Sequence, residues 1–158
     1  MSRYERVMEA FVKTPVGGWL AVNVANPIDR RLLPMTRGNF GLFLGQPVGL
    51  LETIGARSGQ KRQTPLLYVD DGDSVVLVAS KAGAAKHPAW FHNLSANPRV
   101  SFLRRGGNRG DYVAREAEGA ERDELWARAN DLYAGYDTYQ DRAGSRRIPV
   151  VVLDPAGD

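Results

Sequence analysis

VGLLETIGARSGQKRQTPLLYVDDGDSVVLVAS, residues 48–80, is the stretch that decides the fold. It contains three β-rich runs, each bounded by glycine, aspartate or proline: 48–54, 62–69 and 74–80. The DDGD sequence at 70–73 is a strong hairpin signal between the last two runs. Pro65 predicts a sheet edge or a bulge, because proline cannot donate to a strand ladder. The stretch therefore predicts antiparallel strands that follow one another along the chain.

The rest of the chain extends this pattern. Three more β-rich runs follow, at 100–104, 110–118 and 148–153. Two segments between them have helical character: 88–96, and 120 to about 136. The strict strand–helix alternation of a dinucleotide-binding domain is missing. We therefore expect an α+β fold, a small barrel of about six mostly antiparallel strands with flanking helices.

The N-terminal residues 1–47 are expected to form a helical extension of one domain that spans 1–158. Ser2 and Glu5 form a capping box for a first amphipathic helix, and a second short helix is expected over 27–33. The first helix is expected to pack on its own domain. The alternative is weak attachment to a membrane surface, the inner face of the plasma membrane.

Composition excludes several classes of protein. Cysteine is absent, which excludes disulfides, thiolate catalysis and Cys-ligated metals, and the two histidines, His87 and His92, disfavour a multi-histidine metal site. The net charge of +3 favours anionic ligands, but no Lys/Arg block or nucleic-acid-binding motif is present. The first residues are too polar for a secretory signal, and no apolar run approaches the roughly 20 residues of a membrane span. We expect a cytoplasmic protein with no metal and no nucleic-acid partner.

The turn between the first two strands carries the clearest chemistry. Its sequence GARSGQKR, residues 55–62, places Arg57, Lys61 and Arg62 on a turn rich in small residues. Glycine allows the backbone to approach a ligand closely, and arginine forks match the oxygens of phosphates and carboxylates. Residue types alone leave two alternatives open, an anion site and a solvated hairpin tip.

A second candidate site follows the third strand, in ASKAGAAKHPAWFHNL, residues 79–94. A loop of small residues leads into a helix, and a helix N-terminus with lysines nearby suits an anion or a ring carbonyl. A helix cap is the favoured role for His87 over a proton shuttle, and a core position is favoured for Trp90 over a ligand platform.

Tyr133, Tyr136 and Tyr139 form a third feature, spaced by three residues. They are interpreted either as the wall of an aromatic pocket or as a core stripe. A phenol in such a pocket can donate a hydrogen bond to a developing oxyanion. No catalytic triad, paired-carboxylate site or P-loop is evident, so any catalysis here requires a cofactor.

Together and in this order, the three features resemble the deazaflavin (F420)-dependent nitroreductase family of split β-barrel flavin and deazaflavin oxidoreductases. The resemblance runs from about Leu50 to Pro155. It rests on GARSGQKRQTPLLYVDDGD, VASKAGAAKHPAWFHNLSANPRV, YAGYDTYQ and IPVVVLDP. It implies a split β-barrel with coenzyme F420 as its cofactor, and FMN is the less favoured alternative.

The resemblance also implies roles for individual residues. Contacts to the F420 phosphate and oligoglutamate tail are implied for Arg57, Ser58, Gly59 and Arg62, with Lys61 assisting. The phosphate–ribityl path is implied for Thr64, Pro65, Leu66 and Tyr68. The deazaflavin ring would be framed by Ser80, Ala85, Lys86, Trp90 and Asn93. The substrate side is implied for Tyr133, Tyr136 and Tyr139. The family pattern at 81–82 is Asn-Gly, whereas this chain has Lys81-Ala82.

The implied activity is that of an F420-dependent reductase. It would transfer a hydride from reduced F420 to a small electron-poor acceptor, which is a quinone, an enone or a nitroaromatic. Tyr133, Tyr136 or Ser80 would hydrogen-bond the acceptor oxygen as the catalytic group. The alternative is a non-catalytic protein of the same fold that binds or carries F420 or FMN. Barrels of this class often pair, so a homodimer is also expected.

Overall fold

The computed structural model describes residues 6–7, 10, 14, 26–35 and 46–157, and everything below refers to these. Their strands are β1 (Val48–Ile54), β2 (Lys61–Leu67), β3 (Val69–Asp71), β4 (Ser74–Val78), β5 (Arg99–Leu103), β6 (Arg109–Glu116) and β7 (Val150–Pro155). Their longer helices are α3 (Asn26–Met35), α4 (Ala89–Ala96), α5 (Gly119–Leu132) and α6 (Gly135–Ala143), and a short 3₁₀ turn, η2, spans Lys81–Gly83.

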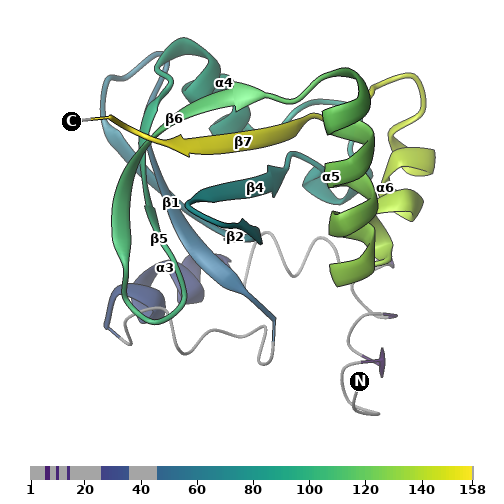
Figure 1. Ribbon diagram of the computed structural model, residues 1–158, viewed down its shortest axis with the longest axis horizontal. Helices are drawn as coiled ribbons and strands as arrows, with labels where there is room; N and C mark the ends of the chain where they lie inside the picture. The colour runs from purple at the N-terminus through teal and green to yellow at the C-terminus, as the bar shows by residue number, and fades with distance from the viewer. Residues whose placement is uncertain (1–5, 8–9, 11–13, 15–25, 36–45, 158) are drawn as a thin grey trace.

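The strands form one curled antiparallel sheet in the order β2-β1-β5-β6-β7-β4-β3. Figure 1 shows the curl, with α5 and α6 together on one side of the sheet and α3 on the other. This half-barrel with flanking helices confirms the expected α+β split-barrel architecture. The strand number is seven rather than about six, because the predicted 62–69 run breaks at Tyr68, whose N–H donates to Pro47 O. The break sends β2 and β3 to opposite edges of the sheet.

The inside of the curl is filled by apolar side chains from five strands and from α4. Alternation along each strand places one set of side chains there. Leu51, Leu77, Phe102 and Leu153 are fully buried in this inner core, and Trp90 and Leu94 of α4 complete it. Helix α4 is therefore held against the open side of the half-barrel by its apolar face, which fixes the position of the loop before it.

The outer faces of the sheet are covered by the other helices. Leu33 of α3 packs on Val48 and Leu50 of β1, and Leu125 of α5 packs on β4 and β7. The predicted helix 120–136 is wrong in one respect: the chain leaves the helix at Tyr133, whose φ of −146° and ψ of 97° are extended, and begins α6 at Gly135. No helix in the described part of the chain is long and apolar enough to cross a membrane.

Local turn signals are confirmed. The DDGD sequence joins β3 and β4 as a hairpin in which Asp71 pairs with Ser74, and Pro65 lies on the edge strand β2. Helix α3 confirms the expected helix over 27–33 and extends it at both ends. The predicted first helix falls largely outside the described residues.

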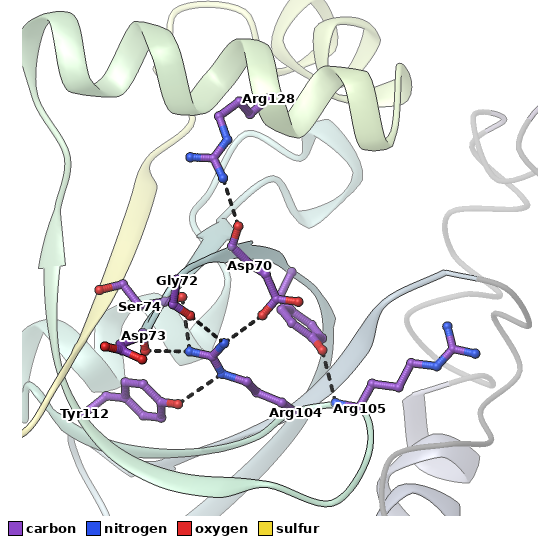
Figure 2. A network of polar contacts seen from close by, with 9 residues as sticks. Asp70, Gly72, Asp73, Ser74, Arg104, Arg105, Tyr112 and Arg128 are labelled. Atoms are coloured by element: carbon purple, nitrogen blue, oxygen red, sulfur yellow. Dashed lines mark hydrogen bonds and ion pairs between the residues drawn. The ribbon is translucent and has the colours of Figure 1, made fainter.

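Arg104 connects the end of the inner strand β5 to the β3–β4 hairpin at one edge of the sheet (Figure 2). It follows β5, and its guanidinium donates to the side chain of Asp70 at 2.7 Å and to the carbonyl oxygens of Gly72, Asp73 and Ser74. Its Nε donates to the Tyr112 hydroxyl at 3.2 Å. Because β6 and β7 separate β5 from the β3–β4 hairpin in the sheet, these contacts connect two parts of the curl that strand pairing does not join directly.

Candidate functional site

The turn between β1 and β2 is held by its own backbone. Gly55 N–H donates to Gln60 O at 2.8 Å, and Gly59 N–H donates to Gly55 O at 2.9 Å. Gly59 has a φ of +66°, a left-handed conformation that glycine takes without steric cost. The Ser58 hydroxyl accepts from Gln60 N–H at 3.2 Å and lies 3.5 Å from Arg62 Nη2. The turn is thus a defined structure whose side chains face solvent.

Asn93 ties this turn to α4. Its Oδ1 accepts the N–H of Ala56 at 3.0 Å, and its Nδ2 donates to Thr53 Oγ1 at 3.4 Å. Both of its amide atoms therefore contact the β1–β2 connection. The resemblance assigned Asn93 to the cofactor ring, and this role stays a prediction. The contacts show that Asn93 fixes the basic turn beside α4.

Exposed cations without an acidic partner among the described residues lie both in the basic turn and in the 79–87 loop. Arg57, Arg62 and Lys86 form no ion pair with the residues that the structure describes. Lys61 differs, because its Nζ lies 3.2 Å from Glu52 Oε1. Guanidinium and ammonium groups without a carboxylate partner are available to an anion, whereas the ammonium group of Lys61 already has Glu52 as its partner.

The faces of β2 separate its residues into two groups. Residues two apart along a strand point to the same side. Leu66 packs against the inner core, so Arg62 and Thr64 share that inner face, while Lys61 and Gln63 both contact Glu52 on the outer face. Tyr68 is fully committed to the inner core: it is 3% exposed, and its hydroxyl accepts from Arg105 N–H at 3.1 Å.

The loop from Ala79 to His87 contains an unusual backbone turn. Lys81, Ala82 and Gly83 have φ angles of +47°, +53° and +77°. Only the last is a glycine, and a left-handed conformation is unfavourable for the other two. The Asn-Gly of the family pattern at 81–82 suits such angles, so Lys81-Ala82 retains the turn at a cost in backbone strain.

Helix α6 packs directly against this loop. A Cβ on Gly83 would lie 2.6 Å from Tyr139 O, and Arg142 Nη1 donates to Ala82 O at 3.1 Å. Ala82 also packs on the cluster that contains the three tyrosines. The loop therefore connects α4, which it precedes, with the tyrosine cluster.

Tyr133, Tyr136 and Tyr139 lie together, with ring centroids 5.3 to 6.4 Å apart. They are 5–7% exposed and form a core cluster with Ala129, Ala143 and Ile148, as the core-stripe interpretation expects. The hydroxyls of Tyr133 and Tyr139 are 3.0 Å apart and hydrogen-bond each other. The substrate-side role of the three stays a prediction.

Tyr136 has the most unusual environment of the three. Its hydroxyl has no hydrogen-bond partner among the residues that the structure describes, although the side chain is 5% exposed. Burial, and secondarily the nearby Tyr139, raises the pKa of Tyr136 above its ordinary value. A buried donor without an acceptor is costly, so this phenol is available for an acceptor atom that a ligand brings.

The remaining predicted residues lie along the same line of contacts. Trp90 is 6% exposed in the inner core, and its role at a ring stays a prediction, as do those of the exposed Ala85 and Lys86. Ser80 lies at the start of the strained turn, and its hydroxyl makes no hydrogen bond to the described residues. The structure thus joins the basic turn, α4, the strained loop and the tyrosine cluster by direct contacts.

Two arginines of this region were missed from the sequence. Arg142 and Arg146 donate to backbone carbonyls of the 79–87 loop. An arginine that binds carbonyl oxygens far away in the chain leaves no spacing pattern, so the sequence alone does not reveal this role.

Comparisons with known proteins agree with this geometry. The family model described as F420H(2)-dependent quinone reductase matches residues 30–155. The F420H(2)-dependent quinone reductase Rv1261c of Mycobacterium tuberculosis is 44% identical over 110 residues, which cover 68% of this chain and 72% of that protein. A solved F420-H2 dependent reductase (FDR-A) is 42% identical with a TM-score of 0.63, over 68% of this chain and 94% of that one.

A second solved relative, described as a domain-swapped dimer, is 36% identical with a TM-score of 0.66 and covers 89% of this chain and all of that one. The match of the family model extends over more than half of the chain, and the sequence identity to Rv1261c and to FDR-A exceeds 40% over 68% of it. The chain belongs to the F420H2-dependent quinone reductase family.

Proposed function

We propose that this protein is an F420H2-dependent oxidoreductase that reduces a quinone, and that its site runs from the basic β1–β2 turn to the tyrosine cluster. The observation that carries the proposal is the family match over residues 30–155, together with exposed cations that have no acidic partner in the described structure, Arg57 and Arg62 in the basic turn and Lys86 in the 79–87 loop. The enone and nitroaromatic acceptors of the resemblance remain alternatives for the same site.

The residues present fit the charge of the cofactor. F420 carries a phosphate and a tail of glutamates, and Arg57, Arg62 and Lys86 have no carboxylate partner in the described structure. Arginine binds carboxylate and phosphate groups through two parallel N–H donors. A polyanion with several charges makes fuller use of such a set than the single phosphate of FMN, which favours F420 over FMN.

When bound, F420 supplies the hydride at C5 of its ring. Arg57 and Arg62, with Ser58 and Gly59, would hold the phosphate and tail, and the 79–87 loop with Lys86 would hold the ring. Tyr136 donates its hydrogen bond to the acceptor oxygen, because its hydroxyl is buried without another acceptor among the described residues. A phenol keeps its proton at neutral pH and burial raises the pKa of Tyr136 further, so Tyr136 would stabilise the developing negative charge as a neutral donor.

Two experiments test this proposal. Spectral titration of the purified protein with F420 and with FMN identifies the cofactor, and tight FMN binding without F420 binding contradicts it. Reduced F420 is then mixed with menadione, an enone or a nitroaromatic. Fastest oxidation by menadione supports the quinone, whereas binding without oxidation by any acceptor supports the carrier alternative.

Tyr136→Phe tests the hydrogen bond to the acceptor. The variant removes one hydroxyl and keeps the ring, so F420 affinity is expected to persist while turnover falls about a hundredfold, the lower end of the effect of one lost transition-state donor. Tyr112→Phe is the control, because it removes a partly buried hydroxyl that contacts Arg104 outside the site. Equal turnover of the Tyr136→Phe variant and the wild type contradicts the role.

Two other expectations concern partners. The relative described as a domain-swapped dimer supports a homodimer, which light scattering after size-exclusion chromatography measures directly. Weak membrane attachment through the N-terminal helix predicts cosedimentation with anionic vesicles that is lost when that helix is deleted. A monomer, or no cosedimentation, contradicts the respective expectation.

A further inference from the structure

Arg146, in the connection between α6 and β7, makes an unusual set of contacts. Its Nε donates to Ala84 O at 2.8 Å, its Nη1 donates to Ala79 O at 3.1 Å, and its Nη2 donates to Ser80 O at 2.6 Å. These three carbonyls flank the turn formed by residues 81–83. A single guanidinium therefore joins the entrance and the exit of the strained loop.

The loop requires such support. Three consecutive left-handed residues, two of them not glycine, are unfavourable for an isolated chain. Within the loop itself, the hydrogen bonds are those of Gly83 N–H to Ser80 O at 3.0 Å and of Ala84 N–H to Lys81 O at 3.1 Å. The other contacts of this turn come from Arg142, from Tyr139 and from Arg146.

Arg146 also sets the protonation of His87. Its Nη1 lies 3.0 Å from His87 Nδ1. A guanidinium can only donate, so Nδ1 accepts and the ring proton resides on Nε2. Burial lowers the pKa of His87, the neighbouring Arg146 and His92 lower it further, and Glu116 opposes them.

Arg146 has no carboxylate partner in the described part of the chain. A lysine at this position would keep the charge but would lack the planar fork that reaches three carbonyls and an imidazole together. The geometry is therefore specific to arginine.

We propose that Arg146 is a positioning residue: it holds the 79–87 loop in its left-handed turn, and His87 in its Nε2–H form, for cofactor binding. The part that concerns the cofactor rests on the proposed function. The part that concerns the loop stands on the geometry alone, so the two can fail separately.

The test compares Arg146→Lys with Arg147→Lys. Arg147 is the matched control, because it is adjacent, 68% exposed and no closer than 4.0 Å to Asp123. Amide hydrogen exchange is followed at Gly83 and Ala84, the donors of the turn. Arg146→Lys is expected to speed exchange there about tenfold or more, since several charge-assisted hydrogen bonds are lost, with little change in the strands. Arg147→Lys is expected to leave exchange unchanged.

Two further readouts separate positioning from general stability. The ¹⁵N shifts of His87 in the wild-type protein are expected to show a proton on Nε2 at neutral pH, and this measurement needs no variant. Arg146→Lys is also expected to raise the Kd for F420 several-fold while the KM for menadione stays the same.

Each other result overturns a defined part. Equal exchange in the two variants, or a proton on His87 Nδ1 in the wild type, overturns the proposal that Arg146 holds the loop and His87. Faster exchange spread evenly over the sheet shows a general stabilising role and overturns positioning. Local loss with unchanged F420 affinity overturns the link to the site. If the wild-type protein binds no F420, the proposed function fails. The comparison of hydrogen exchange between Arg146→Lys and Arg147→Lys still tests whether Arg146 holds the loop.

Discussion

Arg104→Met is expected to destabilise the fold, because it removes the polar contacts that connect the end of β5 to the β3–β4 hairpin. Methionine keeps an unbranched apolar side chain but removes all five N–H donors. The arginine side chain is 17% exposed and makes one bond to the Tyr112 hydroxyl, one to the Asp70 carboxylate and three to backbone carbonyls of the β3–β4 hairpin (Figure 2). Its loss therefore leaves the β5 end and the hairpin without their polar connection.

The structure limits the size of the effect. Asp70 is 61% exposed, so its ion pair contributes no more than about 1 kcal/mol. The carbonyls of Gly72 and Asp73, in exposed residues, regain water when the arginine is removed. The Ser74 carbonyl and the Tyr112 hydroxyl are partly buried, and an unsatisfied group of this kind costs about 1–3 kcal/mol. We expect a loss of about 2–4 kcal/mol in the free energy of unfolding.

Urea unfolding of Arg104→Met and Arg105→Met measures this loss. Arg105 is the control, because its side chain extends away from the hairpin in Figure 2 and only its backbone N–H bonds Tyr68. In a thermal melt, at this chain length, the expected change lowers the melting temperature by roughly 4–16 °C, whereas Arg105→Met changes it little. An ordinary surface substitution changes the free energy of unfolding by no more than about 0.5 kcal/mol. If the free energies of the two variants differ by less than this, Arg104 does not stabilise the connection between β5 and the hairpin as argued.

Two further predictions concern backbone strain and pH. Lys81→Gly is expected to raise the free energy of unfolding by about 0.5–1 kcal/mol, since glycine takes the φ of +47° without steric cost; a loss in urea unfolding contradicts the strain. Burial raises the pKa values of Tyr136 and Tyr139 above the pKa of about 10 that tyrosine has in the unfolded chain. Their contribution to the free energy of unfolding is therefore complete below about pH 10 and is lost as the pH rises toward the raised pKa values of the folded protein. Stability should fall above about pH 10 and less steeply in Tyr136→Phe; identical slopes contradict this assignment. The lowered pKa of His87 acts in the opposite direction, so its contribution is lost as pH falls below about 6.5.

Local signals in the sequence predicted most of the sheet and the basic turn. β1, the hairpin at 70–73 and α4 follow from short runs bounded by glycine, aspartate or proline, and the structure has them at or near the predicted bounds. These signals act within a few residues, so a single sequence contains them. The same locality explains why Arg57, Lys61 and Arg62 were identified together on one turn.

Long-range contacts were not predictable in the same way. The break at Tyr68 depends on Pro47 O and on burial in the inner core, and neither is visible in a β-rich run. Arg146 binds carbonyls 62 to 67 residues earlier in the chain, and Arg104 binds a hairpin about 30 residues earlier. Only the folded chain shows that these arginines connect segments that the sequence presents as independent.

The central claim is that the β1–β2 turn binds the anionic tail of F420, and tail-length dependence tests it most directly. Dissociation constants are measured for F420 with short and long oligoglutamate tails, in the wild type and in Arg57→Ala, Arg62→Ala and Arg105→Ala. Arg105 is an exposed arginine beyond the opposite end of β1, as the pairing of Leu50 with Leu103 shows.

Each charge-assisted contact contributes about 1.5–3 kcal/mol at most, and somewhat less at an exposed site, so the two turn variants should bind F420 roughly tenfold more weakly. The loss should grow with tail length, and Arg105→Ala should match the wild type. Equal affinities for all tail lengths in all four proteins would contradict the claim that this turn is the site of the polyanion.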